Sequence, residues 1–144
     1  MGLFSRLTGK QPEKKSSDDQ LLFHTMICMA AADGVLEESE IATVEAFFLS
    51  LPEFRSLEFR SLLDNTNKLF NRHGGVAESV KELAGIESPA VRKKAFILAV
   101  DVALSNGDVD ESEDQMLDAM QRILTVDDAF AGKVIEVLSA KYAQ

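Results

Sequence analysis

The sequence predicts an all-α fold of about seven helices, and three features of the chain support this. Apolar residues recur at spacings of three and four along most of the chain, as they do on the buried face of a helix. No stretch shows the sustained alternation of apolar and polar residues that a half-buried strand requires. A short pattern of glycine, apolar and acidic residues occurs at Gly34 and again at Gly107, 73 residues later. The repeat predicts two pseudo-symmetric helical hairpins, each with an acidic glycine turn.

Size and charge limit the classes of function. The chain has 144 residues, of which 46% are hydrophobic and 27% charged, as expected for one domain with a sizeable core. We expect residues 1–17 to form a short N-terminal segment and polar linker, and residues 18–144 to form the helical domain. The net charge of −9 argues against nucleic-acid binding, which needs a basic surface. The charge is uneven, because residues 1–15 hold four basic residues and one acidic residue.

Residues 1–10 have the pattern of a short amphipathic helix. They combine three apolar residues at helical spacing with two basic ones, namely Leu3, Phe4, Leu7, Arg6 and Lys10. Such a turn either packs on the domain or makes weak peripheral contact with anionic lipid. The chain has no apolar run that could span a membrane and no secretory signal, so we expect a cytoplasmic protein.

The first hairpin is predicted to join a helix that begins near Ser17 to a helix over about residues 37–50. Ser17 and Gln20 fit a capping box, and Gly34 is expected to end the first helix at its C′ position. Pro52 cannot continue the second helix. The expected core residues of this hairpin are Leu22, Phe23, Met26, Ile27, Met29, Ala30, Ile41, Val44, Phe47, Phe48 and Leu51.

Two further helices are predicted between the hairpins, over about residues 56–72 and 76–84, each followed by glycine. The second hairpin is predicted to begin at Pro89, with Ser88 as its N-cap, and its first helix should run to about residue 105. The helices that follow are expected over about residues 110–124 and 127–142.

Helix capping alone can explain both acidic turns. Glu37 and Asp110 would act as N-caps, and Glu40 and Glu113, three residues later, would complete capping boxes. Acidic groups at a helix N-terminus stabilise it by roughly 0.3–1 kcal/mol each. The apolar residues of the turns are expected to pack on the core, and these are Val35, Leu36 and Val109.

The density of carboxylates in the turns also predicts a cation site. If both turns lie at one end of the domain, their charges repel one another unless solvent, a pKa shift or a cation relieves the repulsion. Carboxylate oxygens suit Ca²⁺, Mg²⁺ or Mn²⁺ better than Zn²⁺. The turns are not EF-hands, because their glycine is second rather than sixth. The carboxylates concerned are Asp33, Glu37, Glu38 and Glu40 in the first turn and Asp108, Asp110, Glu111, Glu113 and Asp114 in the second.

Other reactive side chains do not form a recognisable site. His24 and His73 are isolated, and Cys28 has no second cysteine, so a zinc site is not favoured. We expect His24 to be a core or boundary residue and Cys28 to be a small buried hydrophobe. No catalytic constellation or phosphate loop is visible, so we expect no enzymatic activity.

The stretches Ala31-Ala32-Asp33-Gly34-Val35-Leu36-Glu37-Glu38-Ser39-Glu40 and Ser105-Asn106-Gly107-Asp108-Val109-Asp110-Glu111-Ser112-Glu113 resemble the doubled signature of the tellurite-resistance TerB family. The same domain type is found at the N-terminus of DjlA-type co-chaperones. The opening Gly-Leu-Phe-Ser-Arg-Leu-Thr-Gly is similar to the short N-terminal segment of the family. The resemblance covers about residues 18–142.

The resemblance implies a seven-helix fold with internal pseudo-symmetry, an acidic metal-chelating site and a non-enzymatic role in bacterial stress response. It also implies protein partners such as a membrane-bound TerC-like protein or calcium-binding TerD-like proteins. By position, Asp33 and Glu40 match the first motif, and Asn106 and Glu113 match the second. Asn106 replaces the usual aspartate of the family, so Asp108 or Asp110 would have to supply that charge. The alternative is a metal-free interaction domain with an acidic face.

Overall fold

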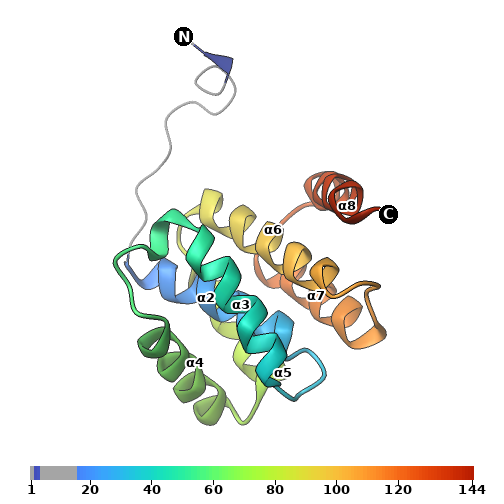
Figure 1. Cartoon of the computed structure of the whole chain (residues 1–144). Helices are drawn as coiled ribbons and strands as arrows, with labels where there is room; N and C mark the ends of the chain where they lie inside the picture. The colour runs from blue at the N-terminus through green and yellow to red at the C-terminus, as the bar shows by residue number, and fades with distance from the viewer. Residues whose placement is uncertain (1, 4–15) are drawn as a thin grey trace.

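The computed structural model describes residues 2–3 and 16–144 of the chain. Between residues 16 and 144 it contains seven α-helices, two short 3-10 helices and no strand, which confirms the predicted fold class. The α-helices, labelled in Figure 1, are α2 (Ser16–Ala30), α3 (Glu38–Ser50), α4 (Phe59–His73), α5 (Val76–Ser79), α6 (Pro89–Ser105), α7 (Glu111–Ile123) and α8 (Asp128–Tyr142). The 3-10 helices are η1 (Pro52–Phe54) and η2 (Val80–Gly85).

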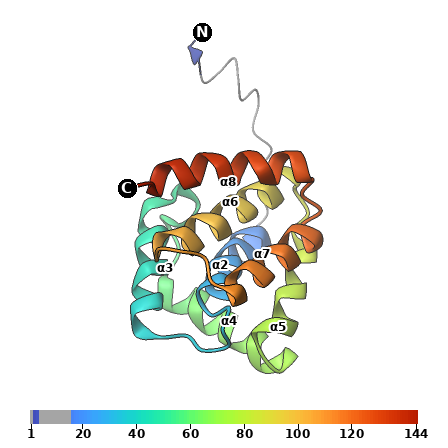
Figure 2. The same ribbon diagram turned by 90° about the vertical axis from the view of Figure 1, so that its right-hand side faces the viewer.

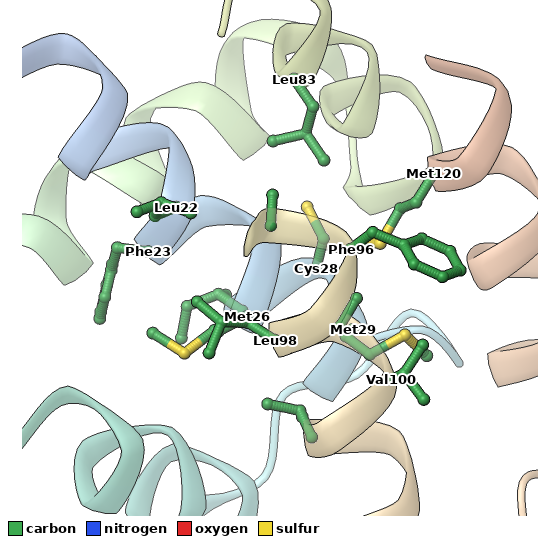
Figure 3. Packing of buried hydrophobic residues seen from close by; sticks show 14 of the residues in the cluster. Leu22, Phe23, Met26, Cys28, Met29, Leu83, Phe96, Leu98, Val100 and Met120 are labelled. Atoms are coloured by element: carbon green, nitrogen blue, oxygen red, sulfur yellow. The ribbon is translucent and has the colours of Figure 1, made fainter. Parts of the chain in front are cut away.

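The core is built around α2 and α6, which are the first helices of the two hairpins. Every residue from Leu22 to Ala31 is buried, including the polar His24 and Thr25. Figure 3 shows the buried side chains of both helices in one cluster, with Met26 and Met29 of α2 close to α6. The predicted apolar stripe of α2 is therefore confirmed but too narrow, because a helix buried on all sides has no polar face.

The remaining helices cover this central pair. The helices α3 and α4 pack on α2, whereas α7 and α8 pack on α6. In Figure 2, α8 crosses the molecule above α6, and α3 stands at the opposite edge from α5. The hairpin α2–α3 and the hairpin α6–α7 thus have matching positions in the fold, each with its first helix inside.

Four phenylalanine rings join α3, η1 and α4 to α2. Phe23 of α2 makes edge-on contacts with Phe48, Phe54 and Phe59, at centroid distances of 6.3, 6.3 and 5.3 Å. Gln20 adds a polar contact, because its Nε2 donates to the carbonyl oxygen of Leu62 at 3.2 Å. The predicted capping box of Ser17 and Gln20 is therefore wrong: α2 already begins at Ser16, and the amide of Gln20 binds α4.

Several predicted boundaries also differ from the structure. The helix expected from Ser56 begins at Phe59, because Glu58 is extended at φ −96° and ψ 130°. The single helix expected over residues 76–84 consists of α5 followed by η2. The buried residues Val80, Leu83 and Ile86 are three positions apart, and residues at this spacing lie on the same side of a 3-10 helix.

The first hairpin turns earlier than expected. The helix α2 ends at Ala30, so Gly34 is not its C′ residue as predicted. Pro52 ends α3 as expected, but it also opens η1. Among the described residues, no helix is long and apolar enough to cross a membrane. The expectation of lipid contact by residues 1–10 concerns a segment of which residues 1 and 4–10 lie outside the described part.

Candidate functional site

The two acidic turns line one hollow, although they lie 73 residues apart in the chain. This hollow has a volume of about 260 Å³, and we call it the acidic pocket. All six predicted metal ligands line it. The complete lining is Met29, Ala30, Ala32, Asp33, Glu37, Ser39, Glu40, Asn106, Asp108, Asp110 and Glu113.

The first turn is held by a tight bend and by the side chain of Asp33. The N–H of Gly34 donates to the carbonyl of Ala31 at 2.8 Å, and Gly34 has a φ of +93°. Glycine adopts this left-handed conformation at little cost. Asp33 Oδ1 accepts the N–H of Val35 at 3.0 Å. Val35 is 57% exposed, so its predicted packing on the core is wrong, whereas Leu36 does pack there.

The second turn follows its helix more closely. Asn106 is the C-cap of α6, and Gly107 is the C′ residue with a φ of +104°. The N–H of Gly107 donates to the carbonyl of Leu104 at 3.1 Å. Val109 packs on the core, as the sequence predicts.

Capping boxes start the helix that follows each turn, as predicted. Glu40 Oε1 accepts the N–H of Glu37 at 2.8 Å, and Glu113 Oε1 accepts the N–H of Asp110 at 3.1 Å. Asp110 Oδ1 in turn accepts the N–H of Glu113 at 2.8 Å. Each of these three carboxylates binds backbone through one oxygen. Within residues 16–144, the second oxygen of each makes no hydrogen bond, so it remains available to a ligand.

The carboxylates of the pocket also act on one another. Burial raises the pKa of Glu40, and the charges of Asp33 and Glu37 raise it further, against the hydrogen bond from the N–H of Glu37. Burial likewise raises the pKa of Glu113, and the charges of Asp110, Glu40 and Asp33 add to this effect, against the hydrogen bond from the N–H of Asp110. Because Asp33 and Glu40 belong to the first turn, the two turns share one electrostatic environment.

The donor set suits a hard cation, since it consists of carboxylate, amide and hydroxyl oxygens. The positions of the donors are less favourable. In the described part of the chain, no group of three or more His, Cys, Asp or Glu side chains is arranged to hold a metal ion. A cation would therefore require inward rotation of the acidic side chains.

The structure places the other reactive side chains elsewhere. His24 is buried in the core, where its Nε2 lies 3.1 Å from the carbonyl oxygen of Ser79. His73 pairs with Glu82 at 2.7 Å. Cys28 is buried as predicted, and burial raises the pKa of its thiol to about 12. None of these residues lines the acidic pocket.

The predicted ligand set omits two polar residues that line the pocket, Glu37 and Ser39. The repeat itself could have identified Glu37, because it lies 73 residues before Asp110, which was included. Of the other acidic residues in the turns, Glu38, Glu111 and Asp114 are exposed outside the pocket.

The fold and the site together define the class of protein: it is an all-helical domain in which two acidic turns line one pocket. The family model described as "Tellurite resistance protein TerB" matches residues 20–133. The chain therefore belongs to the TerB family, a domain family that is in general non-enzymatic. Comparisons with curated proteins and with solved structures gave no match.

Proposed function

We propose that this TerB domain is a non-enzymatic stress-response module that binds a divalent cation in the acidic pocket and acts through protein partners in the cytoplasm. One observation carries the proposal. Two turns from separate halves of the chain bring three carboxylates each to one small hollow, as Asp33, Glu37, Glu40, Asp108, Asp110 and Glu113.

The raised pKa values of Glu40 and Glu113 support a cation as the ligand. Burial raises both pKa values most and neighbouring carboxylates raise them further, and a divalent cation would relieve both effects. The oxygen donors favour Ca²⁺, Mg²⁺ or Mn²⁺ over Zn²⁺. The cation would tie the turn of the first hairpin to the turn of the second, and so order the surface around the pocket.

The family resemblance suggests partners for this surface, namely a membrane-bound TerC-like protein or TerD-like proteins. A second candidate function is a metal-free interaction domain whose acidic face binds a basic protein segment. The wide spacing of the carboxylates favours this second function, because no described group of three is already arranged around one ion.

Calorimetry of the metal-stripped full chain separates the two functions. At constant ionic strength, one of Ca²⁺, Mg²⁺ or Mn²⁺ should raise the free energy of unfolding by about 2.7 kcal/mol at 100 times its dissociation constant. The variant Asp33→Ala/Glu113→Ala should lose this gain. The matched control Asp64→Ala/Glu136→Ala, which removes two exposed acids outside the pocket, should keep it.

Equal responses to all salts of the same ionic strength would contradict the cation site. The acidic face would then be the functional surface. In that case, binding of a lysine-rich peptide should weaken as salt rises, and the Asp33→Ala/Glu113→Ala variant should bind it less tightly than the control variant.

A further inference from the structure

A second hollow, of about 620 Å³, lies between α3 and α4, and we call it the α3–α4 groove. Its floor is apolar and consists of Ile41, Phe59 and Leu63. Its rim carries the three glutamates Glu38, Glu45 and Glu58. None of these residues lines the acidic pocket, so the groove is a separate surface.

The floor of the groove is firmly held by the core. The ring of Phe59 packs edge-on against Phe23 at 5.3 Å and against Phe48 at 5.4 Å. Phe59 and Ile41 nevertheless remain only half-buried. Leu63 completes the floor from α4. The groove therefore offers a preformed apolar surface to a small number of side chains.

The rim gives this surface a negative charge. Glu38, Glu45 and Glu58 are exposed, and within residues 16–144 none of them forms an ion pair. Arg60 is the one basic residue in the lining. An apolar floor beneath unpaired carboxylates is complementary to a short segment that carries apolar and basic side chains together.

We propose that the α3–α4 groove binds the N-terminal segment of its own chain, residues 3–10. Leu3, Phe4 and Leu7 have the helical spacing that would present three apolar side chains to the floor. Arg6 and Lys10 would then face the glutamates of the rim. Leu3, which the structure describes, is 57% exposed, so binding in the groove would remove apolar surface from water.

The connection of the segment to the domain favours binding within one molecule. The first helix begins at Ser16, about one turn before Gln20, whose side chain binds the carbonyl oxygen of Leu62 on α4. Leu63, the next residue of α4, lines the groove. Residues 11–15 can span at most about 17 Å, so they tether residues 3–10 to the end of α2. A short tether of this kind gives an effective concentration on the order of millimolar.

The acidic pocket is a less suitable site for this segment. It offers negative charge, but its apolar lining is limited to Met29 and two alanines, Ala30 and Ala32. The α3–α4 groove has more than twice its volume and an aromatic floor. The groove therefore matches both properties of the segment, whereas the pocket matches only its charge.

A spin label on the full chain tests the proposal by nuclear magnetic resonance. Cys28 is fully buried and its pKa is about 12, so a label should attach only to the new cysteine of a Ser5→Cys variant. We expect the label to broaden the amide signals of Ile41 and Phe59 and to leave the signal of Glu136 on α8 unchanged. Undiminished signals from Ile41 and Phe59 would overturn the proposal.

Two variants of the labelled protein form a matched pair. Glu45→Lys reverses one charge on the rim and should reduce the broadening, whereas Glu136→Lys reverses an equally exposed charge on α8 and should not. Phe4→Asp/Leu7→Asp should abolish the broadening without changing the signals of α8. Equal broadening in all variants would show that the segment does not use the groove.

A mixture of isotope-labelled protein without a spin label and spin-labelled protein without isotopes separates two further outcomes. Broadening that appears only within one molecule supports the proposal. Broadening between molecules overturns it and makes the groove a contact between two copies.

Discussion

The two acidic turns have the same spacing from their glycine to the capping glutamate, yet their charges are arranged differently. At the position of Asp33 the second turn has Asn106, and at the position of the exposed Val35 it has Asp108. Each turn nevertheless contributes three carboxylates to the acidic pocket. The comparison teaches that the two halves keep the number of carboxylates at the pocket, although one of the three, Asp33 or Asp108, differs in position by two residues.

The ends of the preceding helices explain part of this difference. The helix α2 ends at Ala30, and the chain makes a further turn before Gly34. The helix α6 continues to Ser105, and Asn106 acts as its C-cap. Asp33 is therefore part of an open turn, where its carboxylate can accept the N–H of Val35. The second turn supplies the corresponding charge from Asp108.

The largest effects should come from the two turn glycines. Gly34→Ala and Gly107→Ala would each force a side chain into a positive φ, and each should destabilise the protein by about 1–3 kcal/mol. No atom lies within 4 Å of an added Cβ at either position, so the cost is conformational rather than steric. Urea denaturation at an unchanged m-value would measure both effects.

Gly132→Ala is the matched control for these variants. Gly132 lies within α8, where an added Cβ also has open space, so alanine should stabilise the helix by roughly 0.5–1 kcal/mol. If either Gly34→Ala or Gly107→Ala were as stable as the wild type, the backbone of that turn would have changed to accommodate alanine. The two turns would then not share the same requirement for glycine.

The next largest effect should come from His24, whose counterpart in α6 is Ile97. Burial lowers the pKa of His24 below 6.5, against the raising effects of the Ser79 carbonyl and the charge of Glu82. The folded protein therefore prefers neutral His24, while the unfolded chain takes up a proton below about pH 6.5. The free energy of unfolding should therefore decrease as the pH is lowered below about 6.5, by up to about 1.4 kcal/mol per pH unit.

His24→Ile copies the second hairpin and should remove this loss. The stability of the variant and of the wild type should be measured by urea denaturation at pH 7.5 and pH 5.5. His73→Gln, which changes the half-buried histidine, is the control. An unchanged difference between the two pH values in His24→Ile would mean that His24 does not carry the effect.

The smallest effects should come from the paired glutamates of the two turns. A raised carboxyl pKa means that the folded state binds a proton more tightly than the unfolded chain, so folded stability decreases as the pH rises through that pKa. Glu113→Gln should therefore stabilise the protein at pH 7 by roughly 0.2–1 kcal/mol. Glu40→Gln should act in the same direction, because burial also raises the pKa of Glu40, and Glu40 and Glu113 repel one another.

Thermal melts at pH 7 and pH 4 would measure these differences, which should shrink at pH 4 as the wild-type carboxyl groups become protonated. Destabilisation by Glu113→Gln at pH 7, in metal-free solution, would show that the capping bond of Glu113 outweighs the repulsion that it experiences.

Periodicity in the sequence predicted the helices well, because the buried face of each helix is formed by residues three and four positions apart in the sequence. It predicted the ends of elements less well. The 3-10 helix η2 and the late start of α4 depend on contacts with other helices, such as the burial of Leu83 against the core. Gln20 appeared to be a capping residue because its partner on α4 is 42 residues away.

The family resemblance implies the six candidate ligands, and the structure brings all of them to one pocket. The sequence alone does not show that the two turns meet, because their meeting follows from the packing of α2 against α6. Glu37 is not among the six, because Asp33 and Glu40 are the residues of the first turn that match the family motif. Its symmetry with Asp110 shows that one side chain can serve both purposes.

The central pair of helices has a consequence for synthesis of the chain on the ribosome. Nine consecutive residues of α2, Leu22–Ala30, are buried in the finished protein, and α6 is the helix that α2 contacts most. Translation at about 5–20 residues per second places the counterpart of each α2 residue roughly 4–15 seconds later. During that interval α2 can pack on α3 and α4 but not on α6, the helix that it contacts most in the finished protein. The acidic turn that follows this helix therefore emerges long before the pocket that it helps to form.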